Sequence, residues 1–426
     1  MKTTTRVPQA PVEPLPALAE FLAPFRVHFA RSEGPHALER YLTGLLTEHP
    51  NKNCDTIAQV VPGTSEQQLQ GLLTAMDWDH DDLNRQRVER MLTLPTEGDG
   101  VLIFDDTGFP KQGHSSVGVG WQYSGTLGKT ANCQVAVNCH YAERTLAWPV
   151  ATRLYLPKDW AFDPDRRAKA KVPDEVEFQT KPEIALGLLD QAVEWGVRWA
   201  CVVADADCGD NPNFLAGLEE RRQRYAAAVR SDFAVADGRR GGPVQRADAV
   251  IAAQPASAWR TVRWREGSKG WLRGRFVALR CRRVQADGKR RAGWLVGEQP
   301  GGDPKADRKY YWSNFRPRAR LETLVGYAHR RHWVEQFHEE AKGLLGWDQY
   351  QGRLWRGFHR NAVCVMLAYS FLVWREWQQR PQRARPGRPR RAFSPSQGQA
   401  APAAAGDPPA GVRWATPPRS QGVAAA

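Results

Sequence analysis

Hydrophobic residues recur at helical spacing over the first part of the chain, and this pattern predicts helices over residues 16–95. Leu38, Tyr41, Leu42 and Leu45 are separated by three or four residues, which places their side chains on one helical face. Residues 1–15 are rich in proline and lack this periodicity. We therefore expect a loose N-terminal segment followed by a helical unit.

The segment DTIAQVVPGTSEQQLQGLLTAM (55–76) predicts two short helices joined by a turn. Pro62 and Gly63 break the first helix, while Ser65 followed by Gln68 forms a capping-box pattern that opens the second. Two short helices around a turn can form a helix-turn-helix that enters a DNA groove. An ordinary helical hairpin in a small bundle has the same pattern, so both interpretations stay open.

From residue 100 the pattern changes to short apolar runs typical of strands. Three runs at short spacing favour an antiparallel meander, and the following segments alternate between helix and strand. This order predicts an α/β domain with a mixed sheet. The expected strands are 101–105, 131–142, 146–157, 199–205 and 225–230, and the expected helices are 181–196 and 211–222.

The last part of the chain divides into three stretches of different composition. Residues 232–318 are rich in Arg, Gly and Trp with strand-like runs, and predict a β-rich insertion. Helical periodicity returns at about 320–376. The tail from 379 is rich in Pro, Arg, Ala and Gly and predicts disorder. Its PGRPRR segment (386–391) resembles a minor-groove AT-hook, although a solvated basic tail has the same composition.

Charge points to a polyanionic partner. The 426 residues carry a net charge of +14 with a pI of about 9.6, which favours nucleic acid over a membrane surface. No apolar run approaches the roughly 20 residues that span a bilayer, and the N-terminus lacks the apolar core of a signal peptide. The seven cysteines contain no CxxC, which argues against structural zinc. We expect a cytoplasmic protein with no membrane partner.

Three sets of carboxylates follow or accompany the predicted elements. Asp105 and Asp106 come directly after the apolar run VLIF, and Asp205 ends a later strand. Glu335 lies on a late helix. An Asp-Gly-rich turn would explain the first pair without any chemistry. Oxygen ligands on rigid strand ends would instead suit Mg²⁺, and two such ions support phosphodiester displacement.

The stretch YAHRRHWVEQFHEEAKGLLGWDQYQGR (327–353) places a carboxylate between cations on one helix face. Arg331, Glu335 and Lys342 fall within about 40° of one another at 100° per residue. A surface helix with i,i+4 ion pairs would show the same spacing. The opposite face is apolar and is expected to pack on the sheet; it consists of Val334, Phe337, Ala341 and Leu345.

At this point the sequence resembles a known family, the bacterial insertion-sequence DDE transposases that carry a Tyr-Arg-Glu-Lys signature. Arg331-x3-Glu335-x6-Lys342 matches the signature, and Tyr327 lies one residue farther from Arg331 than the signature has it. The blocks DDTGFPKQG, QYSGTLGKTANCQ, VVADADCGDN and WVEQFHEEAKGLLGWDQYQGR resemble those of that group and cover most of residues 100–375.

The resemblance implies a fold and its division along the chain. The fold class is α/β, with a ribonuclease H-like mixed-sheet core, a β-rich insertion, a helical N-terminal domain and a disordered basic tail. The expected domains are a helical, DNA-binding unit (1–95), the first part of the core (96–231), the insertion (232–318), the second part of the core with the glutamate helix (319–378) and the tail (379–426).

The resemblance also implies site residues. Asp106, Asp205 and Glu335 are expected to be catalytic and to hold two Mg²⁺ or Mn²⁺ ions. Asp106 is chosen over Asp105 because the first catalytic aspartate of the family tends to precede the threonine directly. Asp105 is then a neighbouring acid. DNA phosphates are expected to contact four residues: Arg331, Lys342, Lys111 and Tyr327.

The function implied is that of a DNA transposase. It is expected to bind double-stranded DNA at the element's terminal inverted repeats, cleave it in a Mg²⁺-dependent reaction and join it to target DNA as a homodimer. Two alternatives remain: another ribonuclease H-like nuclease, and a transposase-derived DNA-binding protein or repressor without catalysis.

Overall fold

The computed structural model describes residues 9–380 except for 126–127, 238–241, 268–269, 286–287 and 303–305. The predicted basic tail and its PGRPRR segment lie outside the described residues. Within the described part of the chain, no helix has the length and apolar character needed to cross a membrane.

The N-terminal region is helical, as its periodicity predicts. Ser65 caps the fourth helix by accepting a hydrogen bond from the backbone nitrogen of Gln68 at 3.2 Å, which confirms Ser65 as the cap, while the Gln68 side chain accepts from the Thr64 hydroxyl. All but the third pack against the long C-terminal helix α14 (Trp355–Gln379), and the third packs on the second and fourth. Their bounds are α1 (Pro16–Leu22), α2 (Glu33–Leu46), α3 (Cys54–Val60), α4 (Glu66–Thr74) and α5 (His80–Leu92).

A mixed sheet forms the centre of the molecule, which confirms the predicted α/β class. Strand β1 pairs antiparallel with β3 and parallel with β5, and β5 pairs parallel with β6. Strands β2 and β4 both pair with β3. The bounds are β1 (Val101–Pro110), β2 (Gly120–Ser124), β3 (Lys129–Ala142), β4 (Ala147–Leu154), β5 (Cys201–Ala204) and β6 (Tyr225–Val229).

The paired aspartates lie inside a strand and do not follow it. The expectation that the first strand ends at residue 105 and gives way to a turn is wrong, because β1 pairs with β3 without interruption from Val101 to Pro110. Its parallel pairing with β5, however, ends at Phe104 opposite Ala204. Asp105 and Asp106 therefore occupy the point at which β1 loses one of its two neighbours.

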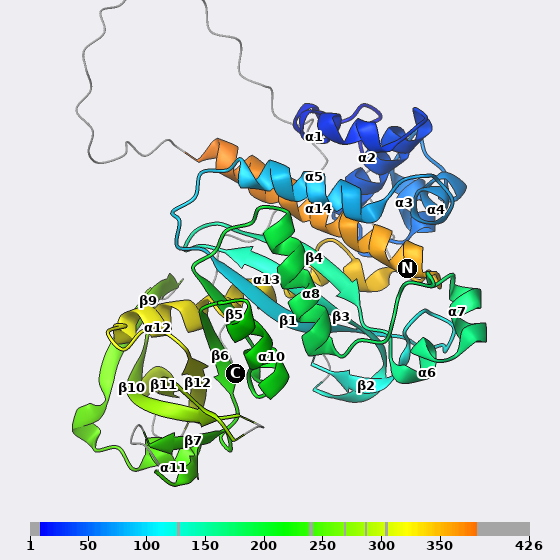
Figure 1. The fold of residues 1–426 in the computed structure, drawn as a ribbon. Coiled ribbons are helices and arrows are strands. Elements are labelled where there is room, and N and C mark those ends of the chain that lie inside the picture. The colour runs from blue at the N-terminus through cyan, green and yellow to red at the C-terminus, as the bar shows by residue number, and fades with distance from the viewer. Residues whose placement is uncertain are drawn as a thin grey trace, which may run out of the picture.

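The strands predicted between 232 and 318 continue the central sheet. Strand β12 pairs antiparallel with β6, so that twelve strands of the described chain belong to one sheet. Figure 1 shows this extension at the opposite end of the molecule from α3 and α4. Its elements are β7 (Ala234–Asp237), β8 (Val244–Arg246), α11 (Ala247–Ala252), β9 (Arg260–Gly267), β10 (Gly270–Val284), β11 (Arg290–Gln299) and β12 (Lys309–Ser313).

Helices cover both faces of the sheet (Figure 1). On one face, α8 (Lys181–Glu194) packs on β3 and β4, and Phe214 of α10 (Pro212–Glu220) meets Phe104 edge-on at 6.3 Å. On the other face lie α12 (Leu321–Ala328), α13 (His332–Gly343) and α14. Sequence periodicity did not reveal β2 or three short helices: α6 (Lys158–Ala161), α7 (Pro164–Ala170) and α9 (Ala206–Gly209).

A buried lysine connects the N-terminal helices to α13. The Lys52 ammonium donates to the carbonyl oxygens of Leu45 and Thr47, each at 2.6 Å, and to that of Leu344. The first two carbonyls end α2 and the third follows α13, where unpaired carbonyls and the helix dipole favour a cation. One side chain thus stabilises two helix ends that are far apart in the sequence.

Candidate active site

The two adjacent aspartates of β1 point to opposite faces of the sheet, because successive side chains of a strand alternate. Asp105 follows Ile103, which packs with α12, and its carboxylate lies 3.8 Å from the guanidinium of Arg331. Asp106 follows Phe104, which packs with α10, and its carboxylate pairs with Lys181 at 2.7 Å. Each acid therefore has its own cation, from a different helix.

Asp205 joins this pair from the neighbouring strand. It comes directly after β5 and caps α9, accepting a hydrogen bond from the backbone nitrogen of Cys208 at 3.0 Å. The parallel pairing of β1 with β5 ends at Phe104 and Ala204, so Asp105 and Asp205 are the residues that follow the last pair. Helix α9 lies so close to β6 that a Cβ atom on Gly209 would stand 1.9 Å from the carbonyl oxygen of Ala228. Glycine is thus required for the tight packing that positions Asp205.

Helix α13 brings the predicted cations and glutamate to the same region. Arg331 precedes the helix and forms an ion pair with Glu335 in its first turn. The Lys342 ammonium donates to Thr107 Oγ1 at 2.6 Å and to the Gly108 carbonyl at 2.9 Å, both just beyond the aspartates on β1. The apolar face is buried as predicted, which confirms its packing; it comprises Val334, Phe337, Ala341 and Leu345.

Buried charge shifts the acid–base behaviour of these groups. Burial raises the pKa of the Asp105 carboxyl, and the nearby charge of Asp205 adds to this rise while Arg331 opposes it. Burial likewise raises the pKa of Asp205. Burial disfavours the charged form of Arg331, but Asp105 and Glu335 raise its pKa overall. The carboxylates are thus crowded, and cations stabilise their ionised forms.

Two further predicted residues have partners of other kinds. The Lys111 ammonium donates to the carbonyl oxygen of Tyr350, which precedes α14. The Tyr327 ring stacks on Phe315, with centroids 5.5 Å apart, and lies 5.3 Å from the Arg330 guanidinium. Neither contact involves the carboxylates. For both residues, contact with DNA stays a prediction.

Comparison with known proteins decides the family. A family model described as DDE superfamily endonuclease matches residues 24–271, which is more than half of the chain. The chain belongs to this family. The matched range contains Asp105, Asp106 and Asp205 and ends before Glu335.

A second comparison points the same way. This chain is similar to a probable transposase for insertion sequence element IS701 from Microchaete diplosiphon, with 26% identity over 320 residues, covering 73% of this chain and 76% of the relative. The resemblance to insertion-sequence DDE transposases is therefore confirmed, and the chain is an enzyme of the DDE endonuclease type.

Endonucleases of this family generally use divalent metal ions, and the oxygen donors here suit such a cation. Within the described residues, however, no three carboxylate, imidazole or thiol groups stand close enough together to hold a metal ion. Two of the acids are paired with side-chain cations instead, Glu335 with Arg331 and Asp106 with Lys181. Carboxylates are ligands that suit a divalent cation, so Asp106, Asp205 and Glu335 fit such an ion chemically, although Asp106 and Glu335 are paired with lysine and arginine side chains.

Lys181 is the site residue that sequence reasoning missed. The sequence predicted a helix beginning at residue 181, but it offered no link to Asp106, which lies 75 residues earlier. Its only local signal is a lysine at the first position of a helix, where the macrodipole disfavours a cation. A cation in that position needs a compensating partner, and Asp106 is that partner.

Proposed function

We propose that this chain is a DNA transposase that acts on the terminal inverted repeats of its own element. It hydrolyses a phosphodiester bond at the element end and joins the freed 3′-hydroxyl to target DNA. The fold in which it does so is a ribonuclease H-like core, and it works on double-stranded DNA as a homodimer. The helix pair α3–α4 is a candidate reader of the element ends.

One observation carries this proposal. Asp105 of β1 and Asp205, which directly follows β5, lie near Arg331 at the start of α13, although they are about a hundred residues apart in the sequence. Cations line the same region, and the whole chain carries a net charge of +14. Acids that can hold divalent cations, surrounded by groups that bind phosphate, support phosphoryl transfer on nucleic acid.

The roles follow from what each group contacts. Asp205 and Glu335 would hold two Mg²⁺ or Mn²⁺ ions together with Asp106, whose carboxylate would leave Lys181 and reach the side of Glu335 beyond the point where β1 loses β5. These ions would supply activation of the attacking water or hydroxyl and stabilisation of the leaving oxygen. Asp105 orients Arg331 at the start of α13. Arg331 and Lys342 bind phosphate oxygens of the DNA, since a guanidinium and an ammonium are suited to this.

The proposal is tested with the full chain, Mg²⁺ and a labelled duplex that carries one element end. Asp205→Asn and Glu335→Gln are each expected to reduce strand cleavage by about a thousandfold, within the range for loss of a group that acts at the reacting atoms. The matched control is Glu339→Gln, an exposed glutamate one turn farther along the same helix, which should cleave as the wild type does.

The outcomes separate the alternatives. Cleavage that survives Glu335→Gln would sink the assignment of this site. Cleavage of hybrid or branched substrates without joining to target DNA would favour another ribonuclease H-like nuclease. Specific retention of element ends without any Mg²⁺-dependent nicking would favour a transposase-derived repressor.

A further inference from the structure

Lys181 pairs with Asp106, and neither the Tyr-Arg-Glu-Lys signature nor the sequence patterns give it a role. Its ammonium lies 2.7 Å from the Asp106 carboxylate, with side chains 27% and 21% exposed respectively. The pair is therefore partly sheltered but open to a ligand arriving from solvent. It lies on the opposite face of β1 from the ion pair between Asp105 and Arg331.

The start of α8 fixes Lys181 in place. Thr180 and Glu183 form a reciprocal capping box, in which the Glu183 carboxylate accepts from the backbone nitrogen and the hydroxyl of Thr180, each at 2.7 Å. Pro182 follows at the second helical position and restricts the backbone further. Glu183, the acid nearest to Lys181 on α8, is thus engaged in the cap, and the Lys181 ammonium pairs with Asp106 instead.

We propose that Lys181 is a positioning residue that pairs with Asp106 in the free protein. When DNA binds, the Lys181 ammonium leaves Asp106 and pairs with a DNA phosphate. This inference rests on the proposed function, because it assumes that Asp106 is a ligand of the divalent cation. In the free protein, Lys181 competes with the metal ion for the same carboxylate. In the DNA complex, the phosphate draws Lys181 away and leaves Asp106 to the metal.

Charge makes this exchange favourable. An ammonium and a divalent cation at one carboxylate repel each other, so each weakens the binding of the other in the absence of DNA. A phosphate beside Lys181 replaces its lost partner, and the N-terminus of α8 adds positive potential at the same place. Binding of DNA and binding of the metal ion then strengthen each other, as reciprocal linkage requires.

A purely structural ion pair predicts something different. If Lys181 served only to stabilise the fold around β1, its removal would loosen Asp106 and weaken metal binding. If it competes with the metal, its removal strengthens metal binding without DNA and abolishes the gain that DNA provides. The sign of the change in metal affinity therefore distinguishes the two roles.

The experiment measures Mn²⁺ binding by calorimetry to the full chain, with and without a duplex carrying one element end. Lys181→Met is expected to bind Mn²⁺ about tenfold more tightly than wild type without DNA. DNA is expected to tighten Mn²⁺ binding by a similar factor in wild type, and not in Lys181→Met. Lys181→Arg, which keeps the charge, should restore much of the wild-type behaviour.

Two comparisons keep the result interpretable. Lys169→Met removes an exposed lysine of α7 and should leave Mn²⁺ binding unchanged, while thermal unfolding verifies that each variant is folded. Unchanged or weaker Mn²⁺ binding by folded Lys181→Met overturns the inference and leaves the proposed function standing. Wild-type protein whose Mn²⁺ binding is absent, or is insensitive to Asp205→Asn, overturns both.

Discussion

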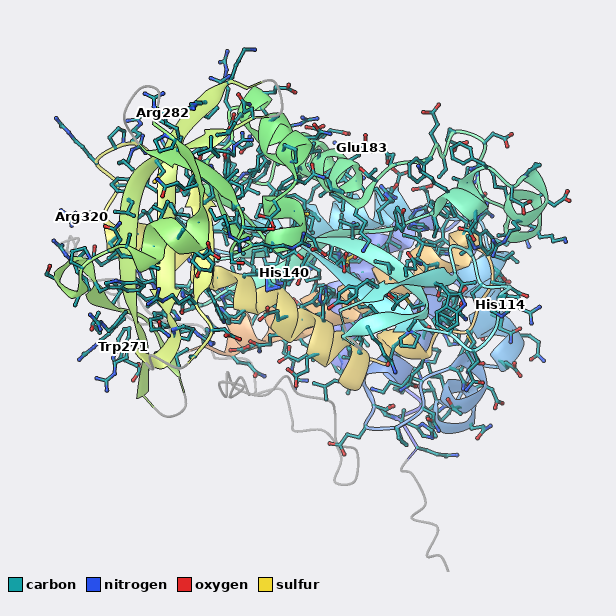
Figure 2. The ribbon with its side chains drawn as sticks, turned by 90° about the horizontal axis from the view of Figure 1, so that it is seen from below. His114, His140, Glu183, Trp271, Arg282 and Arg320 are labelled. Carbon is teal, nitrogen blue, oxygen red and sulfur yellow. The ribbon has the colours of Figure 1, made fainter. Side chains whose placement is uncertain are left out.

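His140 gives the protein a sensitivity to acid that can be worked out from its surroundings. It lies on β3 opposite Ile103, is fully buried, and packs against the Phe337 ring of α13 with centroids 5.2 Å apart. Neither ring nitrogen has a hydrogen-bond partner among the described residues. Figure 2 shows His140 at the middle of the molecule, with Trp271, Arg282 and Arg320 at the end formed by the insertion.

The magnitude follows from the shifted pKa. Burial, with the charge of Arg87 adding to it, lowers the pKa of His140 to about 3, against about 6.5 in an unfolded chain. As the pH falls, the unfolded chain takes up this proton before the folded protein does. The free energy of unfolding is therefore unaffected by protonation of His140 above pH 6.5 and decreases as the pH falls from 6.5 toward 3. Between pH 7 and pH 5 the loss from His140 alone is about 2 kcal/mol.

The assay is the free energy of unfolding from urea titrations at pH 7 and pH 5, for wild type and His140→Leu. The variant should lose about 2 kcal/mol less on acidification. Other buried histidines with lowered pKa values, such as His332 and His338, affect both proteins alike, so the difference isolates His140. His114→Leu, at an exposed position far from His140 (Figure 2), should behave as wild type. An equal loss in wild type and His140→Leu would refute the reasoning.

Three further predictions concern stability, the site and the tail. Lys52→Met should lower the free energy of unfolding by about 3 kcal/mol, because buried carbonyls at two helix ends lose a charged donor; in urea titrations, exposed Lys169→Met should change it by less than about 0.5 kcal/mol. Gly209→Ala should reduce strand cleavage by about a hundredfold, because the new Cβ displaces α9 and the aspartate that caps it. Gly187→Ala, where a Cβ meets open space, should leave cleavage intact in the same assay. Truncation after residue 380 removes the five arginines of RARPGRPRR, and should reduce the slope of log affinity against log salt by up to about 4, measured by DNA-binding titrations; an unchanged slope would mean that the tail makes no phosphate contacts.

Local periodicity was sufficient to predict much of the fold and part of the site. The spacing of Arg331, Glu335 and Lys342 correctly predicted a helix that carries Glu335 and Lys342, with Arg331 directly before it, because helical geometry is set by neighbouring residues. Periodicity could not reveal that β1 continues through its aspartates, since that depends on pairing with β3. For the same reason it could not connect Lys181 to Asp106. Contacts between distant segments are decided by tertiary packing, on which the local pattern carries no information.

Strand geometry gives the two adjacent aspartates different tasks. Because neighbouring side chains of β1 alternate between faces, Asp105 reaches Arg331 at the start of α13 and Asp106 reaches Lys181 at the start of α8. The pair therefore ties helices on both faces of the sheet to one point of one strand. A cation that binds these aspartates would replace Arg331 and Lys181 as their partners, and a phosphate would replace the aspartates as partners of Arg331 and Lys181. Binding at this point of β1 would therefore change the contacts of both α13 and α8. A single aspartate in a turn would reach only one of them, which explains why an apolar strand carries two carboxylates in succession where it loses its parallel neighbour.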